Sequence, residues 1–295
     1  MPFLNKYTPQ APLAEAAHEE GTPVAEYDLN FCYDLPSEAV LQSQGVRLVP
    51  LIPSLHGRRL HQLYTNNPEG FYYLPYGPFP SYPAFLTFLE ERRREPGTLL
   101  FAVHDLALNF DDAREGNEEQ LREKRIAGIV GVLKSTPANR MTEIGHLHIP
   151  TPFQRTHVLT HSIALLLRWL LTPPSSASPS SPPGLGLRRV QWFANALNVP
   201  SIRAAQRLGL SLEAAHMAWD RVTVPGKEGV ALPDFVQGAW REEEEQIGRG
   251  RHSAVLAIGW DDWSEKGGRE RVDELLEGRP VVRRRAVDVP GLLEA

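Results

Sequence analysis

The chain has 295 residues, of which 42% are hydrophobic and 23% are charged, and its formal net charge at pH 7 is -5. This composition is typical of a globular protein with a sizeable core, and it excludes an intrinsically disordered chain. The negative net charge argues against a broad surface for nucleic acid or anionic membranes. Cys32 is the only cysteine, which excludes an intramolecular disulfide and a zinc site made of several cysteines.

The N-terminal residues 1–43 mix proline, alanine and acidic residues without sustained periodicity, and we predict that they form an arm laid over the domain. They lack the basic start and continuous apolar core of a secretory signal. The longest apolar segment, residues 162–171, carries Arg168 and is far too short to span a bilayer. We therefore expect a soluble cytoplasmic protein.

Residues 44–265 are expected to form one domain in which strand and helix patterns follow one another. Alternating or β-branched residues indicate strands, and apolar residues at helical spacing indicate helices. In chain order, the patterns predict a strand at 46–51, helices at 53–66 and 84–94, strands at 98–105, 125–135 and 142–149, a helix at about 156–171, a strand from 187, a short helix at 200–210, and strands at 212–224 and 251–263. This order predicts a mixed α/β sheet with helices on its faces.

Three segments interrupt or extend this domain. Residues 106–123 are highly charged and residues 172–185 are rich in serine and proline, which is typical of solvated insertions. A charged helix is predicted near 268–277, and residues 266–295 are expected to form a C-terminal helical extension. No metal site is expected, because the neighbouring carboxylates of Asp261 and Asp262 lack a second group of ligands.

The turn between the strand at 142–149 and the next helix is dense in hydrogen-bonding groups, with the sequence Gln154-Arg155-Thr156-His157. The first N–H groups of a helix have no intrahelical partner and carry partial positive charge. An anion such as a pyrophosphate gains several hydrogen bonds at such a place without a metal. The alternative is an ordinary helix start with Thr156 as its cap.

Two segments carry a resemblance to a known family. The sequence TEIGHLHIPTPFQRTHVL resembles the strand, Q/R-x-x-G-x-G/A turn and helix of the GNAT acyltransferases, with Gln154 as the first motif residue. The sequence NVPSIRAAQRLGL resembles an element of the RimJ/RimL-like branch that also occurs in fungi, with Asn198, Ser201 and Gly209 in the matching places. The resemblance covers roughly residues 44–263.

The chain departs from the family motif at His157 and Leu159, which take the places of the turn glycines. Side chains at these positions are expected either to push a diphosphate outward or, in the case of His157, to contact a phosphate through the ring. The first outcome would leave a GNAT-like domain without turnover, serving as a binding or regulatory module. The second would keep the site competent.

The resemblance implies a GNAT-like, mostly antiparallel mixed central sheet flanked by helices, in which the strands 142–149 and 187–194 splay apart and form the cofactor cleft. The implied cofactor is acetyl-CoA, with its pantetheine arm beside the backbone of His148 and Ile149. The residues expected to bind it are His148, Ile149, Gln154, Arg155, Thr156, His157, Val158, Leu159, Thr160, Asn198 and Ser201.

The implied reaction is acetyl transfer to a primary amine by direct attack in a ternary complex. It needs a base for the proton of the amine, and Glu143 is the candidate, because its strand resembles one that carries a catalytic glutamate in the histone-modifying branch. Ser201 is the candidate acid for the departing thiolate. The alternatives are that Glu143 pairs with an arginine or lies in solvent, and that Ser201 only caps a helix.

Aromatic residues are the candidates for the acceptor pocket: Tyr72, Tyr73, Tyr76, Trp192 and Trp219. An aromatic pocket favours a flat or cationic amine, although such residues also commonly pack on the core. We expect a small-molecule acceptor, with a protein N-terminus as the alternative, since no acidic groove for a peptide is evident. The acyl length and the oligomeric state stay open.

Overall fold

The computed structural model describes residues 20–35, 41–109, 124–176, 183–278, 280–281 and 284–285, together with positions 4, 6–8, 11 and 13. Most of the charged insertion, the centre of the Ser/Pro-rich loop and the last ten residues lie outside the described part. Within that part, no helix is long and apolar enough to cross a membrane.

The centre of the molecule is a seven-stranded sheet with the order β1-β2-β4-β5-β6-β8-β7. Its strands are β1 (Val46–Pro50), β2 (Leu99–Asp105), β4 (Ile126–Thr136), β5 (Met141–His148), β6 (Arg189–Asn195), β7 (Ser211–Val222) and β8 (Gly250–Gly259). All neighbouring pairs are antiparallel except β5 and β6, which are parallel. The short strands β3 (Leu108–Asn109) and β9 (Arg284–Arg285) form a separate parallel pair. The mixed, mostly antiparallel sheet confirms the predicted fold class.

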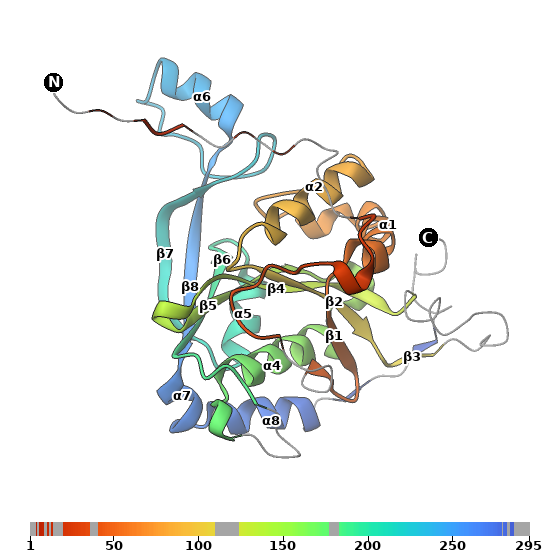
Figure 1. Cartoon of the computed structure of the whole chain (residues 1–295). Coiled ribbons are helices and arrows are strands. Elements are labelled where there is room, and N and C mark those ends of the chain that lie inside the picture. Colours follow the sequence, from red (N-terminus) through yellow and green to blue (C-terminus); the bar gives the residue numbers. More distant parts are fainter. Residues whose placement is uncertain are drawn as a thin grey trace.

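Helices cover both faces of this sheet (Figure 1). Helices α1 (Arg58–Thr65) and α2 (Tyr82–Arg93) lie on one face, and α4 (His157–Leu171), α7 (Trp260–Ser264) and α8 (Gly268–Gly278) lie on the other. Helix α5 (Val199–Arg207) packs against β6, β7 and β8. Short turns of helix are η1 (Val24–Glu26), η3 (Pro53–Gly57), η4 (Pro68–Phe71), η5 (Pro137–Asn139), η6 (Thr151–Phe153) and η7 (Pro174–Ser176).

Helix α4 is the central helix of its layer. Its sequence is apolar almost all round, as expected for a helix buried on several sides. It packs against the sheet on one side and against α8 on the other, so residues such as Leu166 and Trp169 are fully or almost fully buried. Burial of this helix fixes the position of its N-terminus relative to β5, which immediately precedes it.

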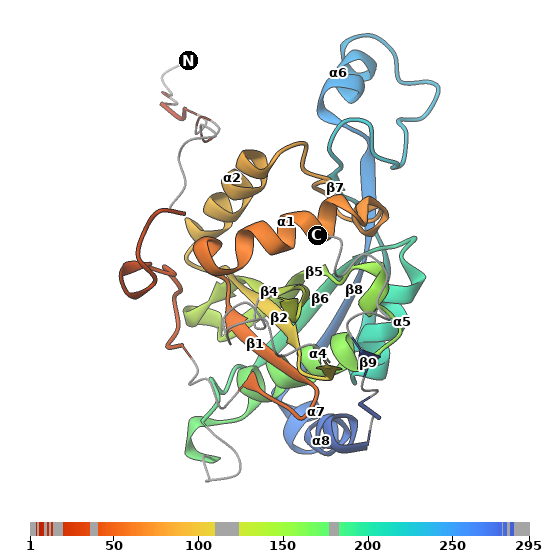
Figure 2. The same ribbon diagram turned by 90° about the vertical axis from the view of Figure 1, so that its right-hand side faces the viewer.

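The segment between β7 and β8 projects away from the body and carries α6 (Ala239–Ile247), as Figure 2 shows. Near the other end of the chain, residues of the N-terminal arm contact the body. Tyr82 donates a hydrogen bond to Glu20 (2.6 Å), and the backbone N–H of Cys32 donates to the carbonyl of Pro96 (2.8 Å).

Two predicted elements are wrong in part. The strand predicted at 251–263 ends at Gly259, where the N–H of Gly259 donates to Asp262 (3.0 Å) and α7 begins. The C-terminal extension is not wholly helical, because β9 follows α8 and pairs with β3. Such a pairing depends on a partner far away in the sequence, which local periodicity does not report.

Candidate functional site

The parallel strands β5 and β6 separate part of the way along their length. They pair from Met141 opposite Arg189 to Ile144 opposite Trp192, and then β5 continues to His148 without a partner on that side. The separation leaves the backbone edge of β5 open toward β6, as expected from the resemblance. An extended chain can add to such an open edge as a further strand.

A β-bulge lies at the point of separation. Gly145 is opposite Gly131 of β4, and His148 is opposite Ile129. Between these two pairs β5 advances by three residues and β4 by two. His146 sits in the bulge with a φ of 50°, a left-handed conformation that is uncommon for residues other than glycine. The bulge interrupts the alternation of side chains along β5 and re-aims His146.

The turn after β5 closes against the strand end. The side chain of Gln154 donates to the carbonyl of Ile149 (2.9 Å), and Arg155 adopts a φ of 59° and is exposed. Thr156 is the N-cap of α4: its hydroxyl accepts from the N–H of Val158 (3.2 Å) and donates to the carbonyl of Phe153 (2.6 Å). The predicted N-cap of α4 is therefore present in the structure, and the N-terminus of α4 lies directly after the separated strands.

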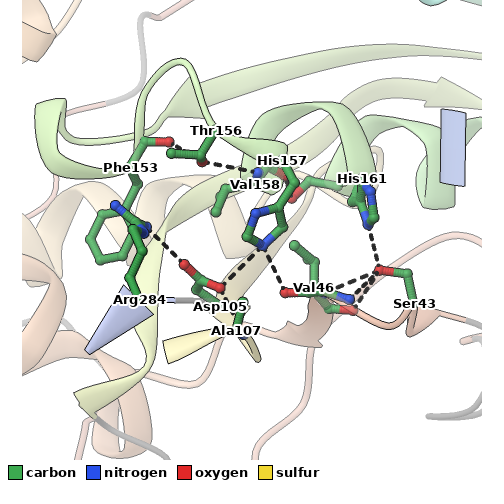
Figure 3. A network of polar contacts seen from close by, with 12 residues as sticks. Ser43, Val46, Asp105, Ala107, Phe153, Thr156, His157, Val158, His161 and Arg284 are labelled. Atoms are coloured by element: carbon green, nitrogen blue, oxygen red, sulfur yellow. Dashed lines mark hydrogen bonds and ion pairs between the residues drawn. The ribbon is translucent and has the colours of Figure 1, made fainter. Parts of the chain in front are cut away.

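The side chain of His157 points into the core, not into the turn (Figure 3). Its Nε2 lies 3.1 Å from Asp105 Oδ1 and 3.2 Å from the carbonyl of Gly45, and the side chains of His157 and Asp105 are both fully buried. The other oxygen of Asp105 accepts from Arg284 (3.0 Å), which also donates to the carbonyl of Pro152 (2.7 Å). The expectation that the His157 ring either obstructs or binds a diphosphate is therefore wrong.

Gly45 supplies the space for this ring. A Cβ atom at position 45 would lie 2.6 Å from Cδ2 of His157, a distance that real Cβ atoms essentially never show. The side chain of Leu159 is likewise half-buried against the core, and that of Thr160 is buried. The side chains of His157 and Thr160 are therefore in the interior, and that of Leu159 is so in part.

A cavity of about 150 Å³, partly open to solvent, lies beside the separation of β5 and β6. It brings together several of the predicted site residues: Tyr73, Tyr76, Glu143, Trp192, Asn198 and Ser201. Two predicted pocket residues do not line it. Tyr72 is exposed, and Trp219 is exposed on the edge strand β7, where repeated register shifts break the expected alternation.

Glu143 is buried and forms ion pairs with two cations. Its carboxylate lies 3.0 Å from Lys134 Nζ and 3.5 Å from Arg221 Nη2. Pairing with an arginine is the alternative that the sequence left open. The carboxylate nevertheless lines the cavity, so this pairing and contact with an acceptor are compatible.

Asn198 and Ser201 are joined in a local network at the start of α5. The side chain of Asn198 accepts from the N–H of Ser201 (3.1 Å) and caps the helix, so the cap is Asn198 and not Ser201. The hydroxyl of Ser201 accepts from Trp192 Nε1 (3.0 Å). Because its oxygen is the acceptor in that bond, the hydroxyl proton of Ser201 is available to another group.

Two histidines of β5 lie among aromatic rings, and of these His148 is buried and His146 is half-buried. His146 Nδ1 lies 3.2 Å from the hydroxyl of Tyr76, and the ring of His148 stacks on Phe71 at 4.1 Å. Burial lowers the pKa of each to about 3, with a further contribution from Arg92 and Arg221 at His146 and from Lys227 at His148. Both rings are therefore neutral at pH 7. The carbonyl of His148 accepts from Tyr64 (3.3 Å).

Sequence analysis missed the basic residues of the cavity. Arg92, Arg221 and Arg251 line it, and they come from α2, β7 and β8, respectively. No local pattern distinguishes them from the other arginines of the chain. They are brought together only by the packing of α2 and the β7–β8 hairpin around the end of β5.

No protein-family model matches the sequence, and no curated protein sequence matches it. Solved structures do. A GCN5-related N-acetyltransferase from Brucella melitensis superposes with a TM-score of 0.58 at 21% identity, covering 82% of this chain and 86% of that one. A GNAT-family protein from Chromobacterium violaceum gives 0.56 at 23% identity, covering 88% and 99%.

A third structure, the ribosomal L7/L12 α-N-protein acetyltransferase RimL in complex with CoA, gives a TM-score of 0.50 at 14% identity, covering 74% and 95%. The chain therefore has the fold of the GNAT acetyltransferases.

Proposed function

We propose that this protein is an acetyl-CoA-dependent N-acetyltransferase of the RimJ/RimL-like branch, and that it transfers the acetyl group to a primary amine of a small molecule. The observation that carries the proposal is the separation of β5 from β6 beyond Ile144 and Trp192, with the capped N-terminus of α4 directly after it. The likeness of the whole fold to GNAT acetyltransferases supports it.

The residues present fit acetyl-CoA. The open edge of β5 beyond Ile144 offers backbone groups to the pantetheine arm, in the manner of an added strand. The backbone N–H groups around Arg155 and His157 offer donors to the pyrophosphate at the positive end of the helix dipole. The inward orientation of His157 keeps its side chain out of this turn.

Acetyl-CoA, when bound, supplies a thioester whose carbonyl carbon the amine nitrogen attacks, with cleavage of the carbon–sulfur bond. Glu143 accepts the proton that the amine loses, because it is the only carboxylate among the described residues that line the cavity. The hydroxyl of Ser201 gives its proton to the departing sulfur and regains one from solvent. Tyr73, Tyr76 and Trp192 shape the acceptor side of the cavity.

Release of the CoA thiol from acetyl-CoA in the presence of an amine panel tests this proposal. Glu143→Gln should lower kcat by about 100-fold or more while acetyl-CoA still binds, because general acid–base contributions are of that size. Glu213→Gln is a matched control, since Glu213 pairs with Arg189 on the exposed surface and does not line the cavity.

A protein that binds acetyl-CoA and turns over no amine would support a catalytically silent module instead. Activity on peptide N-termini alone would favour the protein N-terminal acetyltransferase.

A further inference from the structure

Arg251 is a buried guanidinium on the wall of the cavity. Its exposed fraction is 5%, and it stands on β8 directly opposite Arg221 of β7. These two strands run side by side (Figure 1), so two cationic side chains start from adjacent positions of one ladder. Both side chains line the cavity.

The neighbouring arginines of the cavity have carboxylate partners. Arg221 lies 3.2 Å from Asp220 and 3.5 Å from Glu143. Arg92 lies 3.3 Å from Glu95 and also pairs with a second glutamate beside it.

Arg251 differs from both. Among the residues that the structure describes, it has no hydrogen-bond or ion-pair partner, and its Nε atom is buried without an acceptor.

An unpaired buried charge is costly to a fold. Removing a guanidinium from water without a hydrogen-bonded counter-charge costs several kcal/mol on the general scale for buried ions. Burial and the charge of Arg221 together lower the pKa of Arg251 to about 10, and the charges of Asp220 and Glu143 only partly oppose this shift. At pH 7 the side chain is still charged, so the cavity holds a cation that the fold does not neutralise.

We infer that Arg251, with Arg221 beside it, binds an anionic group of the acceptor, so that the acceptor is a small amine that also carries a carboxylate or phosphate. The inference rests on the proposed function and names its substrate class.

Guanidinium groups match carboxylate and phosphate geometry. Glu143, which also lines the cavity, then contacts the amine group of the acceptor. With three arginines and one carboxylate among the described lining residues, the cavity disfavours a polyamine. The aromatic residues alone favour a cationic amine, but the charges of the cavity do not fit such an acceptor.

The first experiment measures thermal stability in the presence of saturating CoA, which fills the pyrophosphate site. Glutarate serves as the anionic probe and spermidine as the cationic one. Glutarate should raise the Tm of the wild-type protein but not that of Arg251→Met, and spermidine should raise neither. Arg251→Met should itself have a higher Tm than the wild type, because it removes an unpaired buried charge. Arg47→Met, on the far edge strand β1, is the control and should respond to glutarate like the wild type.

The second experiment compares matched acceptors. Free amino acids are set against their carboxamides, O-phosphoethanolamine against ethanolamine, and acidic against neutral peptide N-termini. The anionic member of the preferred pair should have a higher kcat/KM. Arg251→Met should lower that value by about 30-fold or more, as expected for removal of one partner of a buried charge pair, and should lower the value for the neutral member by much less.

Which of the first two pairs shows the preference distinguishes carboxylate from phosphate. Failure of glutarate to shift the Tm, together with equal use of the two members in each of the first two pairs, would overturn the inference while acetyl-CoA binding stands. Activity confined to peptides would overturn the small-molecule acceptor. Loss of acetyl-CoA binding itself would instead overturn the proposed function.

Discussion

Acidification from pH 7.5 to pH 5.5 should destabilise the folded protein, because three histidines are neutral when folded and take up protons on unfolding. The pKa of His56, His146 and His148 is lowered from 6.5 to about 3, mainly by burial. A base whose pKa is lower in the folded state binds more protons in the unfolded state between these two values. The contribution of these three neutral histidines to the free energy of unfolding is therefore present above pH 6.5 and is lost as the pH falls toward 3.

The magnitude follows from linkage. At pH 5.5 an unfolded histidine with a pKa of 6.5 is about ten parts protonated to one part neutral, which favours unfolding by about 1.4 kcal/mol per residue. Three such residues give a loss of about 4 kcal/mol relative to pH 7.5, and of about 1 kcal/mol at pH 6.5. A loss of 4 kcal/mol is a large fraction of the stability of an ordinary domain.

Urea unfolding at pH 7.5, 6.5 and 5.5 measures this loss, and His148→Leu isolates one of its three parts. Both ring nitrogens of His148 are buried without a hydrogen-bond partner, so the leucine removes a titrating group without breaking a side-chain hydrogen bond. The variant should lose about 1.4 kcal/mol less than the wild type between pH 7.5 and pH 5.5. The reasoning is refuted if wild type and variant lose the same free energy over this interval.

Three further substitutions test the turn and the cavity. His157→Ala should lower the free energy of unfolding by about 3 kcal/mol through loss of packing and of its bond to Asp105, with little change in acetyl-CoA affinity; unchanged stability with tighter binding would contradict the inward orientation. Arg155→Gly should raise the stability by about 1 kcal/mol, because its φ of 59° suits glycine, and a lower Tm would count against that conformation. Ser201→Ala should cost about 1–2 kcal/mol by leaving Trp192 Nε1 without an acceptor, and Ser201→Thr should restore it; equal stability of the two variants would argue against this hydrogen bond.

The elements around the site could be predicted from the sequence because their signals are local. The strand predicted at 142–149 is Met141–His148, and the helix predicted at about 156–171 is His157–Leu171 with Thr156 as its cap. Alternation, apolar spacing and a capping residue are all contained within these segments. The separation of β5 from β6 was implied by the family resemblance, not by any local pattern.

The orientation of His157 could not be predicted, because its partners are distant in the sequence. Asp105 and Gly45 lie 52 and 112 residues away, and only the folded chain brings them to the start of α4. Histidine takes the place of a turn glycine at position 157, and Gly45, far away in the sequence, provides the space for the histidine ring. The sequence shows the replacement in the turn, but it does not show that Gly45 lies beside it.

The positive charge of the cavity could not be predicted from the sequence for a similar reason. Arg251 stands near the start of a strand, where an arginine ordinarily points to solvent. It is buried because β7 and β8 extend beside the cavity, and its register opposite Arg221 is set by the irregular pairing of these strands. Trp219, predicted as an aromatic residue of the pocket, is exposed on β7, whose pairing with β8 is irregular.

Calorimetric titration with acetyl-CoA tests the central claim most directly, with CoA as a second ligand and ATP as a control for phosphate binding alone. The account predicts binding of acetyl-CoA and CoA with a Kd in the micromolar range, or about -8 kcal/mol, and no comparable binding of ATP. No detectable binding of either CoA species would contradict it, and the turn at 154–157 would then be only a capped helix start.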